Sequence, residues 1–205
     1  MKRLFIAINP PKEIKYQIDA ICENLKPKFP EARFIPVENL HITLTFLGDQ
    51  PDESIIPILE SIKKTISAIA SSLDISKRSF AIEPLQIELE NSIFSSPKKP
   101  ANKIWLIATK QTSKKLEEIK NKLDEELIKN SVQFKVENWG FNAHITLARS
   151  HRNIDIRGLS TESNKTISEG KIKFEVISID LVQSTLYESG AEYEILEKVD
   201  FKKSV

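Results

Sequence analysis

The stretches HITLTFLG, residues 41–48, and HITLAR, residues 144–149, begin with the same four letters. Both are rich in β-branched and apolar residues, a composition that is typical of β-strands. The chain has only three histidines, and two of them head these two copies, about half a chain apart. The repetition indicates an internal duplication in which each half of the chain supplies one equivalent strand.

The segments around the two copies follow a similar order. In each half a short apolar run typical of a strand precedes an amphipathic helical pattern, at residues 3–9 and 11–26, then at 103–109 and 112–130. The closing segment, from residue 171 onward, alternates as half-buried antiparallel strands do. We therefore expect an α+β fold with two pseudo-twofold-related lobes of mainly antiparallel sheet and outer helices, forming a single bilobal domain over residues 1–205.

Composition limits the classes of function. The chain has 205 residues, of which 40% are hydrophobic, enough for one sizeable domain. Its net charge of +1 argues against a protein that coats long nucleic acid with a broad basic face. The single cysteine, Cys22, excludes an internal disulfide and a zinc site built from several cysteines. Because Cys22 lies in an apolar helical pattern, we assign it to the core.

The first residues, MKRLFIAINPP, do not resemble a secretion signal. The apolar run is short, it ends at two prolines, and no small-residue cleavage site follows. No later run approaches the length of a membrane span. We therefore expect a soluble, cytoplasmic protein that does not associate with membranes.

Strand alternation predicts how the repeated residues are presented. Successive side chains point to opposite faces, so His41, Thr43 and Thr45 are expected on one face of the first strand. His144 and Thr146 are expected together on one face of the second. Each copy then offers an imidazole beside a threonine hydroxyl, backed by apolar residues.

Several kinds of site could use a pair of histidines. One histidine on a strand is most often a structural residue, but the repetition of the motif favours a function. A metal site needs further ligands, and no HxH, HxxxH or nearby carboxylate accompanies either copy. A serine nucleophile is disfavoured because no GxSxG turn is present. Paired acid–base chemistry remains: imidazoles titrate near neutral pH, and in-line attack on phosphorus suits a base and an acid on opposite sides.

The two motifs, with the opening RLFIAI and the closing LVQSTLYESGAEYEIL, resemble the 2H phosphoesterase superfamily over most of the chain. The similarity is closest to the RNA 2′,3′-cyclic phosphodiesterases, also called 2′-5′ RNA ligase-like proteins. This resemblance implies a bilobal α+β module with a central cleft, which opens a cyclic phosphate at an RNA or nucleotide end to leave a 2′-phosphate. It implies no metal and no cofactor, and in some members a 2′-5′ RNA ligase activity.

The resemblance also implies roles for particular residues. His41 would be the general acid that protonates the leaving 3′ oxygen, and His144 the general base that activates water. Thr43 and Thr146 would bind the phosphate, and Arg149 would add a cation. Simple alternation places Arg149 on the face opposite His144, unless the strand ends or bulges there.

Two departures from the family pattern concern the surroundings of the motifs. Relatives often have proline before the second histidine, where this chain has Ala143, and glycine where it has Ile93. The alternatives to a cyclic phosphodiesterase are an RNA- or nucleotide-binding module without turnover and an enzyme that cleaves 2′-5′ oligonucleotide linkages. The expected partners are RNA ends or small nucleotides, and the expected state is a monomer.

Overall fold

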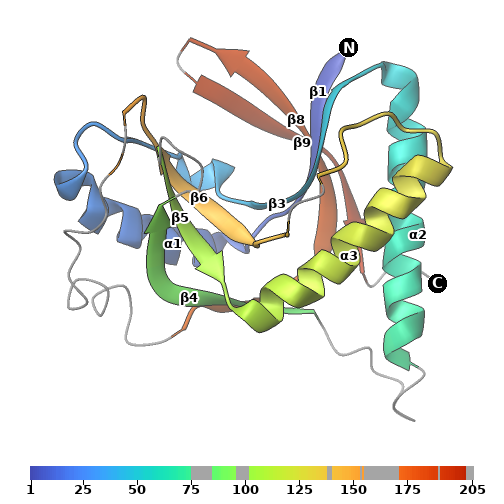
Figure 1. Cartoon of the computed structure of the whole chain (residues 1–205), viewed down its shortest axis with the longest axis horizontal. Helices are drawn as coiled ribbons and strands as arrows, with labels where there is room; N and C mark the ends of the chain where they lie inside the picture. The colour runs from blue at the N-terminus through green and yellow to red at the C-terminus, as the bar shows by residue number, and fades with distance from the viewer. Residues whose placement is uncertain are drawn as a thin grey trace.

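The computed structural model describes residues 1–74, 85–95, 102–137, 140–152, 154, 171–188 and 190–201. Within them the chain forms the α-helices α1 Lys12–Leu25, α2 Ile55–Asp74 and α3 Lys110–Lys129. The strands of the first half are β1 Lys2–Ile8, β2 Arg33–Phe34, β3 Ile42–Gln50 and β4 Gln86–Ser95. Those of the second half are β5 Lys103–Ala108, β6 His144–Arg149, β7 Lys173–Glu175, β8 Ser178–Tyr187 and β9 Gly190–Asp200. Figure 1 shows their arrangement.

The described strands form one antiparallel sheet with the order β7–β4–β5–β6–β3–β1–β8–β9, and β2 pairs with β6. The two motif strands, β3 and β6, lie next to each other in the middle of this order. On one side β1 and β3 are joined through α1, and on the other β5 and β6 are joined through α3. The predicted α+β class is therefore confirmed, while the extent of the domain, residues 1–205, stays a prediction.

The halves of the sheet are interleaved in sequence. The C-terminal hairpin β8–β9 extends the half that holds β1 and β3, whereas β4, from the middle of the chain, extends the half that holds β5 and β6. Each half therefore contains segments from distant parts of the sequence. Simple repetition along the chain does not predict this exchange, because strand partners depend on the tertiary fold.

The main core covers one face of the sheet. All three α-helices contribute apolar stripes to one buried cluster, which also holds Leu4, Ile6 and Ile8 of β1. Cys22 of α1 is 1% exposed in this cluster, as predicted. Figure 1 shows α2 and α3 side by side, with α1 on the other side of the view. Fully burying one such branched side chain contributes about 1.5–3 kcal/mol. The apolar side chains of the three helices therefore determine which face of the sheet is buried.

The opposite face of β1 carries a separate, smaller cluster. It consists of Phe5, Ala7 and Val182, with Tyr193 packed against them. This second face leaves room for polar groups, because no helix stripe of the main cluster covers it in the described part of the chain. Among the described helices, none combines the length and the apolar character that crossing a bilayer requires.

Candidate active site

His41 lies at the start of β3 and is held by its own backbone turn. Its Nδ1 is 2.6 Å from the carbonyl oxygen of Asn39, at the end of the 3-10 turn η2, Val37–Asn39. A carbonyl can only accept a hydrogen bond, so Nδ1 carries the proton. In the neutral ring, Nε2 then accepts from the Thr43 hydroxyl, 3.1 Å away. The predicted pairing of a histidine with the threonine two residues later is therefore present in the first motif.

His144, at the start of β6, is held in the same way. Its Nδ1 donates to the carbonyl oxygen of Asn142 at 2.8 Å. Both imidazoles therefore have the same tautomer, with Nε2 as the atom that can exchange a proton. The repeat in the sequence extends further than HITL, because Asn39 and Asn142 both stand two residues before a motif histidine. This signal could have been found from the sequence alone.

The two motifs meet at one backbone pair. Ile42 of β3 pairs with Ile145 of β6, and the two strands are antiparallel. In an antiparallel pair centred on these two residues, the position opposite His41 is Thr146 and the position opposite Thr43 is His144. Burial is the main cause that lowers the pKa of His41, and a positive charge on His144 would act in the same direction.

A β-bulge in β3 places the residues after Thr43 on faces other than the predicted ones. Ala7 pairs with Thr43 and Ile6 with Thr45, so Leu44 has no partner on β1. The extra residue reverses the alternation. Thr45 is 5% exposed and donates to Asp124 of α3 on the core side, whereas Phe46 lies on the side of His41. The prediction that Thr45 shares the face of His41 is therefore wrong.

A second bulge, at the equivalent position of β6, concerns Arg149. Trp105 pairs with Thr146 and Ile104 with Ala148, so Leu147 has no partner on β5. Alternation is reversed again, and the exposed Arg149 comes to the same face as His144. Of the two possibilities that the sequence left open, simple alternation is wrong and the bulge is present. Arg149 also lowers the pKa of His41 through its charge.

Aromatic rings surround both imidazoles. The centroid of the Phe5 ring is 4.9 Å from that of His41, and Tyr193 meets the same imidazole edge-on at 5.2 Å. On the other strand, Trp105 stacks on His144 with a centroid distance of 3.9 Å. Sequence reasoning did not select these three aromatic residues, because they reach the site through strand pairing rather than through proximity in sequence.

These surroundings lower the pKa of both imidazoles. Burial is the largest cause for His41 and, with the nearby charge of Lys15, lowers its pKa to about 4. Burial also lowers the pKa of His144, and the charge of Lys103 adds to this effect. Hydrogen bonds to the backbone carbonyls oppose the shift in both cases. Both rings are therefore mainly neutral near pH 7 in the free protein, and a bound anion would raise both pKa values.

Comparison with known proteins identifies the family. Residues 8–105 match the family model of the LigT-like phosphoesterases. The chain is 31% identical over 196 residues to an RNA 2′,3′-cyclic phosphodiesterase of Methanocaldococcus jannaschii, covering 96% of this chain and 99% of that protein. The chain belongs to the LigT-like phosphoesterase family. The predicted resemblance to 2H phosphoesterases is thereby confirmed.

Solved structures agree with the fold of this LigT-like phosphoesterase. A Thermus thermophilus protein superimposes with a TM-score of 0.66 at 22% identity, covering 98% of both chains. Escherichia coli LigT in complex with 3′-AMP gives a TM-score of 0.64 at 21% identity, covering 98% of this chain and 99% of LigT. The roles of His41, His144, Thr43, Thr146 and Arg149 stay predictions, although the fold brings all five to one face around β3 and β6.

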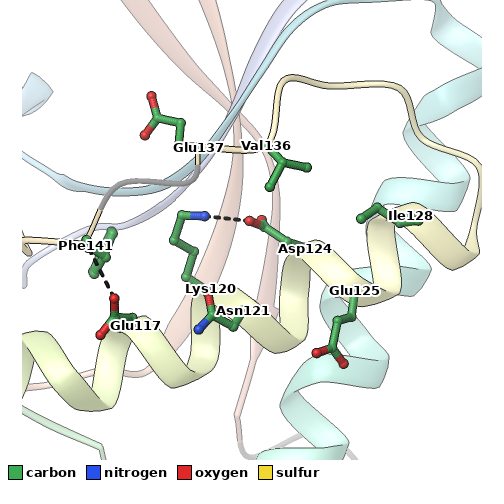
Figure 2. Close-up of a pocket in the computed structure, with 10 residues that line it drawn as sticks. Glu117, Lys120, Asn121, Asp124, Glu125, Ile128, Val136, Glu137 and Phe141 are labelled. Atoms are coloured by element: carbon green, nitrogen blue, oxygen red, sulfur yellow. Dashed lines mark hydrogen bonds and ion pairs between the residues drawn. The ribbon is translucent and has the colours of Figure 1, made fainter.

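Two hollows in this LigT-like phosphoesterase lie away from the histidines. One, of about 500 Å³, opens between α3 and the segment that contains Val136 and Glu137. Figure 2 shows Lys120 and Asp124 paired at its base, and Glu117 accepting a hydrogen bond from the backbone of Phe141. The other lies between the end of α1 and residues 29–37. Both are lined by residues outside the two motifs.

The side chains near the two histidines can be examined for a possible metal site. Within the described residues, no three His, Cys, Asp or Glu side chains lie close enough together to hold a metal ion. The predicted independence from metals and cofactors stays a prediction.

Proposed function

We propose that this LigT-like phosphoesterase hydrolyses 2′,3′-cyclic phosphate ends of RNA or nucleotides to 2′-phosphomonoesters. The observation that carries the proposal is the pair of equivalent imidazoles, His41 and His144, which have the same tautomer and lie on adjacent strands around one backbone pair. The Methanocaldococcus jannaschii relative, an RNA 2′,3′-cyclic phosphodiesterase, supports the choice of substrate.

The proposed reaction needs one proton donor and one acceptor. A water oxygen attacks phosphorus and loses a proton to the base, while the bond from phosphorus to the 3′ oxygen breaks and the acid protonates that oxygen. We assign His144 as the base and His41 as the acid. Because the pKa of His41 is lowered to about 4, the acid role requires the bound phosphate to raise it. Thr43, Thr146 and Arg149 would bind the non-bridging oxygens and stabilise the growing negative charge.

Turnover in the presence of a chelator tests the proposal. We expect the protein to convert adenosine 2′,3′-cyclic phosphate to adenosine 2′-phosphate at an undiminished rate in excess EDTA, as measured by ³¹P NMR. A 3′-phosphate product, or loss of turnover with EDTA, would contradict it. Nucleotide binding without turnover of a cyclic or 2′-5′-linked substrate would favour the non-catalytic module. The 2′-5′ ligase activity, monomeric state and cytoplasmic location stay predictions.

The pH dependence of kcat/KM is predicted from the two lowered pKa values. The imidazole that must be neutral limits the rate as pH falls below its pKa, and the imidazole that must be charged limits it as pH rises above its pKa. We expect a bell-shaped profile with both limbs below pH 6.5, the lower near pH 4. This shape holds whichever histidine is the acid. The limbs of the kcat profile should lie at higher pH, because the bound phosphate anion raises both values.

Steady-state assays from pH 3.5 to about 9 provide the measurement, with a check of folding at each pH by circular dichroism. A kcat/KM profile that is flat through this range, or one with both limbs above pH 6.5, would be incompatible with the two imidazoles as acid and base.

A further inference from the structure

Three cationic residues lie in one row across the second half of the sheet. Arg33 of β2 pairs with Arg149 of β6, and Arg149 pairs in turn with Lys103 of β5. Directly paired residues of antiparallel strands present their side chains on the same face. The bulge at Leu147 brings Arg149 to the face of His144, so the whole row lies on the side of the two histidines.

The pairing of Arg33 with Arg149 is electrostatically unfavourable in the free protein. Like charges on directly opposite strand positions destabilise a sheet, and the ion pairs within the described part of the chain involve other residues than Arg33 and Arg149. The charges of Lys103 and Arg149 are also close enough to the histidines to lower their pKa values. A polyanion next to the reacting phosphate would offset this repulsion.

The side chain of Arg33 lies across the end of the row. Its guanidinium contacts Gly190, at the β8–β9 turn, so closely that a Cβ atom there would come within 2.1 Å of Nη2. Beside it, Asn39 Nδ2 donates to the carbonyl of Ala191 at 3.4 Å. The guanidinium therefore lies between β2 and the β8–β9 hairpin, and the same hairpin carries Tyr193, whose ring contacts the His41 imidazole.

We infer that the row formed by Arg33, Arg149 and Lys103 binds the phosphodiester on the 5′ side of the nucleoside that carries the cyclic phosphate. The preferred substrate is then an oligoribonucleotide end and not a mononucleotide. On β5 the row lies two residues from Trp105, the partner of Thr146. Two residues along a strand advance about 6–7 Å, about the spacing of successive phosphates in an RNA strand. Arg149, at the centre of the row, contacts both phosphates. This inference rests on the proposed function and names its substrate class.

Three substrates separate the contribution of the additional phosphate. They are adenosine 2′,3′-cyclic phosphate, the same nucleotide with a 5′-phosphate, and the dinucleotide ApA with a 2′,3′-cyclic end. We expect kcat/KM of the unmodified protein to rise from the first to the other two. In Arg33→Ala, the ratio of kcat/KM for the dinucleotide to that for the mononucleotide should fall about tenfold, because a charge-assisted hydrogen bond is lost. For the dinucleotide, the slope of log kcat/KM against log salt concentration should become less steep in Arg33→Ala, by the amount expected for the loss of about one phosphate contact.

Two further variants separate binding from structure. Gly190→Ala keeps the charge of Arg33 but displaces the guanidinium, since a Cβ would overlap it and the backbone φ of +132° is strained for alanine; it should lower the same ratio. Lys122→Ala removes one positive charge from the exposed side of α3 and should leave the ratio unchanged.

The outcomes distinguish failure of the inference from failure of the proposed function. Equal losses on all three substrates in Arg33→Ala, or an unchanged ratio, would overturn the inference while the unmodified protein still hydrolyses the mononucleotide. A ratio that falls equally in Lys122→Ala would assign the effect to net charge and overturn it too. An unmodified protein that hydrolyses none of the three substrates contradicts the proposed function itself.

Discussion

Alanine in place of His41 or of His144 is expected to lower kcat for cyclic phosphate hydrolysis by about 10²–10⁴-fold, the usual contribution of a positioned general acid or base. Each variant removes the Nε2 that exchanges a proton, while the backbone carbonyls of Asn39 and Asn142 that orient the rings remain. KM should change less than kcat, because neither imidazole is the main ligand of the ground-state phosphate. Steady-state kinetics with adenosine 2′,3′-cyclic phosphate measures both parameters.

The third histidine provides the matched control. His151 is exposed and stands outside both motifs, so His151→Ala should retain the activity of the unmodified protein. The variant that lacks both motif histidines should be about as inactive as the worse single variant, because an acid and a base that act in one step are strongly non-additive. Turnover within threefold of the unmodified protein in either single variant would remove that histidine from the mechanism.

The sequence allows prediction of the motif residues but not of their exact faces. The period of two along HITLTF holds only up to Leu44, where an unpaired residue reverses it and places Phe46 on the same face as His41. The bulge at Leu147 does the same for Arg149. Bulges depend on the partner strand, so the periodicity of one strand does not reveal them. The bulge in β6, at the position equivalent to that in β3, explains how Arg149 reaches the face of His144, which simple alternation would not allow.

The rest of the site follows from strand order, which the sequence pattern does not specify. Tyr193 lies near His41 because the C-terminal hairpin is added next to β1, and Trp105 lies near His144 because β5 pairs with β6. In contrast, the Asn-x-His spacing that precedes both motifs is visible in the sequence. Both imidazoles donate to the main-chain carbonyl of that asparagine and not to its side chain, so the spacing marks the equivalent turns without explaining the choice of asparagine.

The second large effect is expected on stability, at the ion pair between Asp124 and Lys120. Asp124 accepts a hydrogen bond from Thr45 at 2.7 Å, directly after the bulge of β3, and pairs with Lys120 one turn earlier on α3. The side chains of Lys120 and Asp124 are only 7% and 8% exposed. Asp124→Ala leaves a buried ammonium and a buried hydroxyl without their partner. We expect it to lower the free energy of unfolding by about 3–5 kcal/mol.

Urea unfolding followed by circular dichroism measures this loss, and the same helix offers a matched pair. Glu126 and Lys129 form an ion pair whose side chains are 21% and 63% exposed, so Glu126→Ala should cost less than about 1 kcal/mol. The double variant Lys120→Met, Asp124→Leu should recover most of the stability, because it removes the uncompensated charge and keeps the volume. A loss below 1 kcal/mol in Asp124→Ala would mean that water reaches Lys120 and that the Asp124 contact does not hold the β3 bulge against α3.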